Sequence, residues 1–297
     1  MAESNRVRIA YKAAGAPVTG WKTLRRTGDS LTVGTETVVS DEIRSDRLRG
    51  GSKVVTQTAG GTIDFEFSAT SYDEILEAAF MGAWTNNVLE IGTTTVKLDI
   101  LKSYLDEARH VLIENCEISN LQITMDAASK ITGQITVMGT TIDDDYAITT
   151  DAFAAPGTSL IMDSSNNLGS IQVDGSPVAG VCFTGMGLTL DNGHSSDQCL
   201  GTATQQHWKG SATVTGTVAM RSSAAAFTLW ENTITNTPVK LSYVLTDGAK
   251  SYTFEVAAAH LAGDLPSGGL DAILSFDLTF TAATGAASAY LKVTRVP

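Results

Sequence analysis

The sequence predicts a mainly β (α+β) protein of two tandem β-sandwich domains, each with one short flanking α-helix. Apolar and polar residues alternate along most of its segments, as in strands that bury one face. A strand followed by a short amphipathic helix, here called a cassette, occurs twice, in residues 61–84 and again in residues 209–234. Roughly 150 residues separate the copies, which is about the length of one domain. The fold is therefore expected to be duplicated within the chain.

The 297 residues are expected to divide at changes in composition. The first segment contains Gly15, Pro17 and Gly20 without a helical period, and residues 143–170 are rich in Asp, Ser and Asn around short apolar patches. The expected segments are an extended N-terminal arm (1–27), a first domain (28–145), a linker (146–170) and a second domain (171–297).

The first domain is expected to open with an alternating strand, residues 30–40. A polar, basic and Gly-rich stretch, residues 41–61, is long for a hairpin loop, and long loops inside compact domains are usually functional. The first cassette then places Ile63, Phe65 and Phe67 on one strand face, and Ser71 is a plausible N-cap of its helix. The strands expected to follow are 86–92, 109–119, 121–126 and 130–140, with a hairpin turn at 126–129.

The second domain repeats this order. Residues 186–194 match the first strand, a polar loop (195–210) leads to the second cassette, and residues 272–283 parallel residues 130–140. Asp247-Gly248 between two apolar runs is a strong hairpin signal. Asp191-Asn192-Gly193 is typical of a turn, and His194 after it is expected to be exposed.

Charge is distributed unevenly. Net charge is −12, but residues 1–53 carry ten of the 20 Lys+Arg against six acids, whereas the remainder carries ten bases against 26 acids. A basic arm on an acidic body suggests complementarity between copies, although a solvated tail without a role is the alternative. Tight nucleic-acid binding is disfavoured, because phosphate contacts need clustered bases.

Reactive chemistry finds little support in the sequence. The four His show no metal-ligand spacing, no GxSxG motif accompanies the hydroxyl residues, and contiguous Asp143-Asp144-Asp145 cannot all face one calcium ion. Cys116 and Cys182 lie in apolar strand-like settings, where a free thiol packs as a small hydrophobe, and no disulfide or zinc site is expected. No catalytic, cofactor-binding or metal-binding residue is predicted, and Trp84 and Trp230 are interpreted as core residues.

The sequence shows neither a secretory signal nor a membrane-spanning segment, and both bear on localisation. The start MAESNRVRIAYK lacks the apolar core of a secretory signal, and no apolar run approaches the roughly 20 residues that span a bilayer. Export by that route is not expected.

Residues 18–85 resemble the siphophage major tail tube protein family. The resemblance rests on WKTLRRTGDSL (21–31), the SDEIRSDR turn, the Glu-containing strand and the SYDEILEAAF helix that ends in Trp84. It implies a virion structural protein that catalyses no reaction and binds no cofactor. Sheets of neighbouring domains would join into a β-barrel around a lumen, and stacked rings would form the tail tube that conducts DNA into the host. With a duplicated fold, a homotrimer is expected to make a pseudo-hexameric ring, and a homohexamer is the alternative.

The same architecture assigns roles to two sets of side chains. Polar residues of the lining strands are expected to face the lumen, where acids and hydroxyls would let DNA slide. These candidates are Asp64, Glu66, Gln134, Thr136, Thr213, Thr215, Asp277 and Thr279. The first cassette strand carries Asp64 and Glu66 where the second offers Thr213 and Thr215, so the lumen is expected to alternate acidic and neutral faces. Contacts between subunits or rings are expected from Arg6, Arg8, Trp21, Arg25, Arg26, Arg44, Arg47 and Arg49.

The partners implied by the resemblance are further copies of the chain, a tape measure protein, tail terminator and distal tail proteins, and phage DNA that passes without specific binding. Assembly is expected in the host bacterial cytoplasm. The alternative function is a receptor- or carbohydrate-binding β-sandwich module of a tail tip or adhesin. That module would need exposed aromatic residues on polar loops, for which Trp208 is the candidate.

Overall fold

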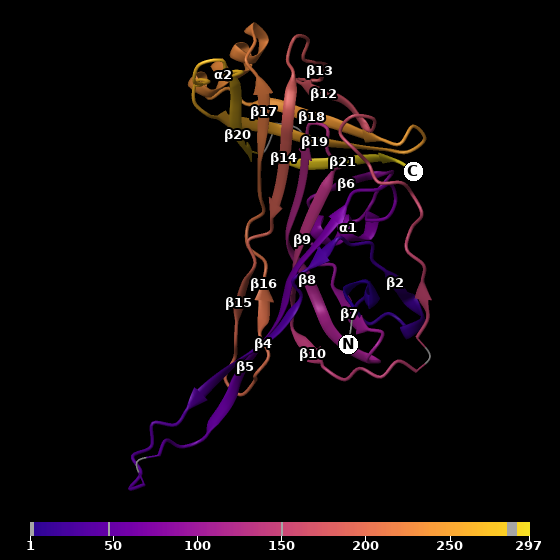
Figure 1. The fold of residues 1–297 in the computed structure, drawn as a ribbon, viewed down its shortest axis with the longest axis vertical. Helices are drawn as coiled ribbons and strands as arrows, with labels where there is room; N and C mark the ends of the chain where they lie inside the picture. Colours follow the sequence, from indigo (N-terminus) through magenta and orange to yellow (C-terminus); the bar gives the residue numbers. More distant parts are fainter. Residues whose placement is uncertain (1–2, 47, 150, 284–289) are drawn as a thin grey trace.

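A computed structural model describes residues 3–46, 48–149, 151–283 and 290–297, which form an elongated body built mainly of strands (Figure 1). The strands of its first half are β1 (Val7–Ala13), β2 (Trp21–Thr23), β3 (Gly28–Asp29), β4 (Thr32–Val39), β5 (Ser52–Glu66), β6 (Val88–Glu90), β7 (Leu98–Tyr104), β8 (Arg109–Asp126), β9 (Thr132–Gly139) and β10 (Thr141–Asp143). Those of its second half are β11 (Phe153–Ala154), β12 (Leu168–Val173), β13 (Ser176–Pro177), β14 (Phe183–Asp191), β15 (Ser195–Asp197), β16 (Gln206–Trp208), β17 (Thr213–Arg221), β18 (Val239–Thr246), β19 (Ser251–Ala262), β20 (Ser275–Ala283) and β21 (Leu291–Val296). The helices are α1 (Asp73–Phe80) and α2 (Ala224–Thr235), with the short 3-10 helices η1 (Ser4–Arg6) and η2 (Val18–Gly20).

The predicted mainly β fold with one α-helix in each half is confirmed. Alternation in the sequence becomes alternation in burial: β9 and β20 bury every second side chain, and the side chains between them are half-buried in β9 and mostly exposed in β20. The predicted hairpins are confirmed as well, because β8 pairs with β9 across residues 127–131 and β18 pairs with β19 across Asp247-Gly248. Gly248 has a positive φ of 95°, the conformation that this turn demands of its glycine.

A single antiparallel sheet runs through both halves of the chain. Its strands follow the order β4, β5, β9, β8, β14, β17, β20, β19, and the step from the first half to the second is the pairing of β8 with β14. Within the chain this sheet stays open. β4 forms one end, and β19 forms the other end together with β18 and β12.

The strand pairings of the first half recur in the second. In the first half β5 pairs with β9, β9 with β8, β8 with β7, and β7 with β1. In the second half β17 pairs with β20, β20 with β19, β19 with β18, and β18 with β12. β10 and β21 also match, since each follows the last of these strands and pairs with the N-terminal part of β8 or β19. The duplication expected from the two cassettes is therefore a duplication of topology.

Local details of the two repeats match too. Both helices end in a left-handed residue, Met81 after α1 and Asn236 after α2. The β7–β8 ladder shifts register between Leu98 and Ile100, and the β18–β19 ladder shifts between Val239 and Leu241. Both ladders are thus interrupted at equivalent places in the two repeats.

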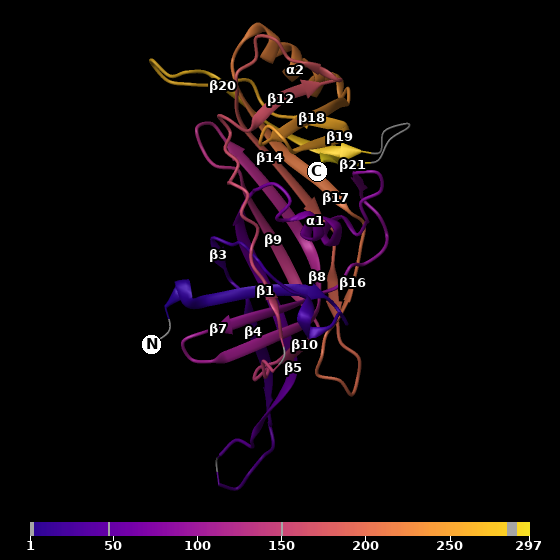
Figure 2. The same ribbon diagram turned by 90° about the vertical axis from the view of Figure 1, so that its right-hand side faces the viewer.

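The segment boundaries differ from the expected ones. The described part of the expected arm, residues 3–27, is not separate from the body, because β1 pairs along its whole length with β7 (Figure 2) and β2 pairs with β1. The expected linker (146–170) contains β11, which pairs with β2. β12 begins the second repeat at Leu168, three residues before the expected start.

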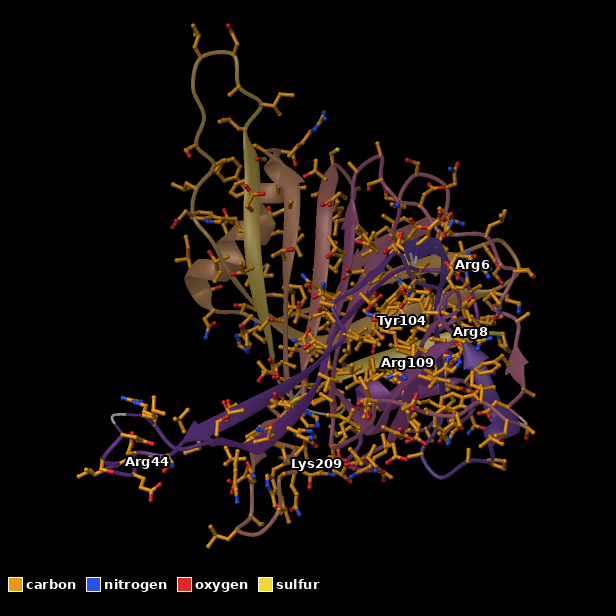
Figure 3. The ribbon with its side chains drawn as sticks, turned by 60° about the horizontal axis from the view of Figure 1, so that its bottom comes forward. Arg6, Arg8, Arg44, Tyr104, Arg109 and Lys209 are labelled. Carbon is orange, nitrogen blue, oxygen red and sulfur yellow. The ribbon has the colours of Figure 1, made fainter. Side chains whose placement is uncertain are left out.

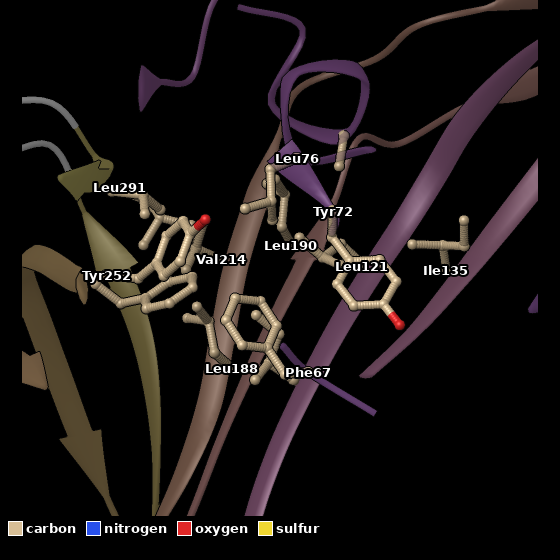
Figure 4. Packing of buried hydrophobic residues seen from close by; sticks show 14 of the residues in the cluster. Phe67, Tyr72, Leu76, Leu121, Ile135, Leu188, Leu190, Val214, Tyr252 and Leu291 are labelled. Atoms are coloured by element: carbon tan, nitrogen blue, oxygen red, sulfur yellow. The ribbon is translucent and has the colours of Figure 1, made fainter. Parts of the chain in front are cut away.

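One large core lies on the inner face of the sheet and serves both repeats (Figure 4). Phe67 of the first repeat packs edge to face on Tyr252 of the second, with ring centroids 5.5 Å apart. Leu121, Leu188 and Leu190 are buried in the same cluster. Two tandem domains were expected, whereas the two repeats share this core.

Helix starts follow ordinary capping chemistry with one correction. Ser223 caps α2 by accepting a hydrogen bond from the Ala226 amide at 3.1 Å. Ser71 does not cap α1, which begins at Asp73; its hydroxyl instead accepts a hydrogen bond from Ser68 at 2.8 Å. Trp84 is half-buried beside α1, and its Nε1 donates to the Asp73 carbonyl at 3.2 Å.

Candidate functional site

The joint between the two repeats is the central structural feature of the sheet. The C-terminal half of β8 pairs with β14 from Asn120 opposite Asp191 to Asp126 opposite Gly185. On the inner face Leu121 lies opposite Leu190 and Ile123 opposite Leu188, and all four are buried. Apolar cross-strand pairs of this kind stabilise an antiparallel ladder.

Polar side chains form hydrogen bonds and close polar contacts at the end of this joint. The side chain of Asn192 is buried and donates hydrogen bonds to the carbonyls of Ala79 and Ile118, both at 2.9 Å. His194 was expected to be exposed, but its side chain is fully buried and lies 2.9 Å from a Glu117 carboxylate oxygen. Lys97 lies 3.2 Å from the other oxygen of Glu117. Asn192 is therefore a buried connection to the first repeat, whereas Asp191 and Gly193 on either side of it are exposed.

All eight residues predicted for the lumen lie on one face of the continuous sheet. Residues directly opposite each other in a ladder share a face, and the ladders connect Asp64 to Gln134, Gln122, Thr189 and Thr215 in one row across five strands. None of the eight belongs to the core, since each is half-buried or exposed. The other members of the set are Glu66, Thr136, Thr213, Asp277 and Thr279, reached through the same ladders.

On this polar face one acidic side chain accepts a hydrogen bond from an amide and another forms an ion pair. Gln134 Nε2 donates to Asp64 Oδ1 at 2.6 Å, and Lys130 forms an ion pair with Glu66. The strand ends align Glu66 with Arg221 and Asp64 with Ala219, because β5 and β17 end at Glu66 and Arg221 and each is followed by its helix. Thr213 and Thr215, expected to be their counterparts, lie further back along β17. The acidic character of the first repeat is absent from the equivalent positions of the second.

The β4–β5 hairpin projects beyond the body and carries Arg44 near its tip (Figure 3). Arg44 pairs with Asp46 at 2.9 Å, and Arg49 is exposed nearby; Arg47 lies outside the described residues. The hairpin also exposes apolar side chains, namely Val38, Val39, Ile43, Leu48, Val54 and Val55. Exposed apolar and basic groups together on one projection suit contact with another protein surface.

The other predicted contact residues make hydrogen bonds, ion pairs and packing contacts inside the chain. Trp21 is 1% exposed, packs against Tyr146 and Phe153, and donates to Asp151 at 2.7 Å, so it serves the core of the chain itself. Burial and the hydrogen bond to Asp151 raise the pKa of Tyr146 to about 12. The remaining residues of this set have these partners: Arg6 with Asp106, Arg8 over the Phe153 ring, Arg25 with Ser68 and the Ser159 carbonyl, and Arg26 with Asp29 and the Val7 carbonyl.

The basic groups near the N-terminus gather on one side of the body. Figure 3 shows Arg6, Arg8 and Arg109 on that side, away from Arg44. Burial lowers the pKa of the Arg8 guanidinium, although Asp151 raises it in part. The basic residues of the N-terminal segment therefore lie in two places, the hairpin and this region.

The cysteines and Trp208 differ in how far they are buried. Cys116 is buried, as predicted, and burial raises the pKa of its thiol. Cys182 was expected to pack as a small hydrophobe but is exposed, because its residue lies in the connection before β14 and outside the strand. Trp208 is 57% exposed on β16.

Sequence reasoning missed the joint itself. Leu121 and Leu190 are far apart in sequence, and alternation in β8 and β14 predicts a buried face without naming the partner strand. The buried side chains of Asn192 and His194 carried no signal, since their sequence is typical of an exposed turn.

Comparison with known proteins agrees with this geometry. A family model described as phage tail tube protein matches residues 4–288, which include the first repeat, the joint and the second repeat as far as β20. No curated protein sequence matches the chain. Within the described part of the chain, neither helix has the length and apolar character needed to cross a membrane. The chain belongs to the phage tail tube protein family.

Proposed function

We propose that copies of the chain assemble into rings of three, in which six repeats stand in pseudo-sixfold symmetry, and that stacked rings form the tube of a long non-contractile tail. Family membership gives the chain a structural role in a phage tail tube. The observation that carries the proposal is the joint of β8 with β14, which already joins two repeats edge to edge in one sheet. Joining chains in the same way would close the sheet and remove its free edges.

The polar face of the sheet would then line the lumen. Its acids and hydroxyls, among them Asp64, Asp277 and Thr279, would repel or only weakly hold a phosphate backbone, so that DNA slides during ejection into the host. Alternation between Glu66 and Arg221 at equivalent positions would make this surface threefold in charge and sixfold only in shape.

Contacts between rings would come from the projecting hairpin. Arg44, Arg47 and Arg49 could meet acidic groups of the next ring, given the net charge of −16 beyond residue 53. Further partners would be a tape measure protein, the tail terminator and distal tail proteins. The protein would act in the virion tail after assembly in the host cytoplasm.

Negative-stain microscopy of the purified chain at high concentration tests this proposal. Rings and stacked tubes with a central lumen are expected. A dispersed monomer of 31.2 kDa at every concentration would contradict it.

A receptor- or carbohydrate-binding module remains the second candidate, and the exposure of Trp208 is the observation that favours it. Trp208 belongs to the β15–β16 hairpin, whose loop also contacts β5, because the Gln57 amide donates to the Ala203 carbonyl at 2.9 Å. Glycan-array binding that is lost in Trp208→Ala, without loss of assembly, would support the module.

A further inference from the structure

At the central joint β8 of the first repeat pairs with β14 of the second. The segments equivalent to these two strands in the other repeat lie at the two ends of the sheet. Glu66 and Arg221, the last residues of β5 and β17, are equivalent. Counting along the ladders from this pair makes residues 28–34, in β3 and β4, equivalent to 185–191 in β14. The same count through β9 and β20 makes residues 262–268, at and beyond the end of β19, equivalent to 120–126 in β8.

We propose that residues 262–268 of one copy pair antiparallel with residues 28–34 of the next copy. The register would place Ala262 opposite Gly34 and Gly268 opposite Gly28, as Asn120 lies opposite Asp191 and Asp126 opposite Gly185 inside the chain. This inference rests on the proposed ring and names the two segments that close it. Figure 2 shows the gold loop between β19 and β20, which contains residues 263–274, reaching away from the sheet.

Exposed apolar side chains at the two ends match buried ones at the joint. Leu265 is 56% exposed, whereas its counterpart Ile123 is fully buried. Val33 is 42% exposed, whereas its counterpart Leu190 is 1% exposed. The proposed register places Leu265 opposite Leu31, as Ile123 lies opposite Leu188. Pairing would remove the exposed apolar surface of Leu265 from water at each contact between copies.

The direction of the backbone groups fits the same register. The Ser30 amide donates to the Thr62 carbonyl at 2.9 Å, so even-numbered residues of this segment bond to β5. Because successive residues of a strand direct their backbone groups to opposite sides, Leu31 and Val33 direct theirs away from β5. Lys102 Nζ lies 3.5 Å from the Leu31 carbonyl oxygen, which has a second lone pair for a strand hydrogen bond.

Pro266 is compatible with this pairing, because backbone hydrogen-bonding groups alternate in direction along a strand and those of Pro266 point away from the next copy. At the joint the Asn192 amide donates to Ser119 and the Ala127 amide donates to Thr184, so odd-numbered residues of β8 bond β14. Thr124, the counterpart of Pro266, therefore bonds β9 on its other side. The amide that Pro266 lacks would point toward β20 of its own chain and not toward the next copy.

Two leucines of the same loop supply a matched test. Leu265→Asp places a charge in the proposed contact, whereas Leu270→Asp alters a residue that is 95% exposed and lies beyond the paired segment. Both variants are expected to keep the melting temperature of the unassembled chain. Leu265→Asp is expected to reduce ring formation at least tenfold, and Leu270→Asp to leave it unchanged. Normal assembly of Leu265→Asp would overturn the inference.

A disulfide tests the register itself. With exposed Cys182 and Cys199 changed to Ser, Thr32→Cys and Asp264→Cys would face each other at a non-hydrogen-bonded position, about 4.5 Å between Cα atoms. Within a chain six strands lie between the two sites, which is seven strand-to-strand steps or about 34 Å along the sheet, so an oxidised ladder of linked chains must come from different copies. Thr32→Cys with Ala262→Cys is the control, because that diagonal pair is about 7–8 Å apart.

Each outcome of the disulfide experiment decides between the two proposals. Linked chains from Thr32→Cys with Asp264→Cys, and few from the control, support the register. Rings in the microscope without this cross-link, or with equal linkage in the control, overturn the register and leave the proposed ring intact. Absence of rings in the parent protein overturns both.

Discussion

Leu190 of the second repeat lies directly opposite Leu121 of the first, and both side chains are buried on the inner face of one sheet. This pair marks the place where the two repeats become one structure. Its importance for the single chain and for the assembly can be separated, because Val33 occupies the equivalent place at the free end of the sheet.

Leu190→Ala is expected to destabilise the chain by about 2–5 kcal/mol, since it removes buried methyl groups and leaves a cavity. Val33→Ala is the matched control and is expected to cost less than about 1 kcal/mol in the unassembled chain, because Val33 is partly exposed there. Urea denaturation at a concentration below assembly measures both. Equal costs at the two positions would show that the joint contributes nothing beyond an ordinary edge strand.

Asp277→Lys tests the polar face. Because Asp277 is exposed on this face, its replacement should leave assembly intact while exchanging three negative charges for three positive ones in a ring of three chains. DNA is expected to bind such tubes at low salt and to dissociate as salt rises. Glu107→Lys makes the same charge change in the exposed turn between β7 and β8, and binding equal to that of Asp277→Lys would argue against a lumen on this face.

Reversing the hairpin charges with Arg44→Glu, Arg47→Glu and Arg49→Glu is expected to allow single rings but to shorten or abolish stacked tubes. The reason is loss of attraction between the hairpin and an acidic neighbour. The Lys versions of the same three changes keep the charge and should restore stacking. Tube length in micrographs is the measurement, and tubes of normal length in the Glu variant would remove the hairpin from the contact.

Glu255 links three strands of the second repeat and should make stability depend on acid pH. Burial alone raises its pKa, but hydrogen bonds from Lys240 and Lys292 outweigh burial and hold the pKa of this carboxyl below its usual range. A lowered folded-state pKa stabilises the chain above the pKa of the unfolded glutamate, about 4.3, and this contribution is lost as pH falls through the folded value.

Glu255→Gln should therefore be less stable than the parent by about 1 kcal/mol at pH 7, and the difference should shrink below pH 4. Denaturation at several pH values measures it, with Glu107→Gln as the control in an exposed turn. A difference that stays constant from pH 7 to pH 3 would mean that the lysine contacts do not stabilise the folded carboxylate.

The sequence predicted the repeated elements well, because each rests on a local pattern. Alternation identified β9, β20 and the C-terminal part of β5, and Asp247-Gly248 identified the β18–β19 hairpin. Residues 52–60 were expected in a polar loop but belong to β5. The order of elements also revealed the duplication, and the pairings confirm it.

Long-range pairing could not be predicted in the same way. Nothing local in residues 7–13 indicates β7 as a partner some 90 residues away, so β1 was expected in a free arm. The shared core depends on β8, whose 18 residues serve β7 and β10 in one half and β9 and β14 in the other. One alternating pattern cannot specify four partners.

The polar face was easier to predict than the contact residues. A strand that buries Ile63 and Phe65 must present Asp64 and Glu66 on its other side. Arginines carry no such constraint, and Arg26 proved to form an ion pair with Asp29, which also binds Lys102. Charge alone did not distinguish a surface contact from an internal one.

The mass of an isolated ring tests the central claim most directly. Native mass spectrometry of rings separated at low protein concentration should give about 94 kDa, three times the chain mass of 31.2 kDa. A ring of six chains, about 187 kDa, would mean that the two repeats of one chain do not occupy two of six positions, and would contradict the account.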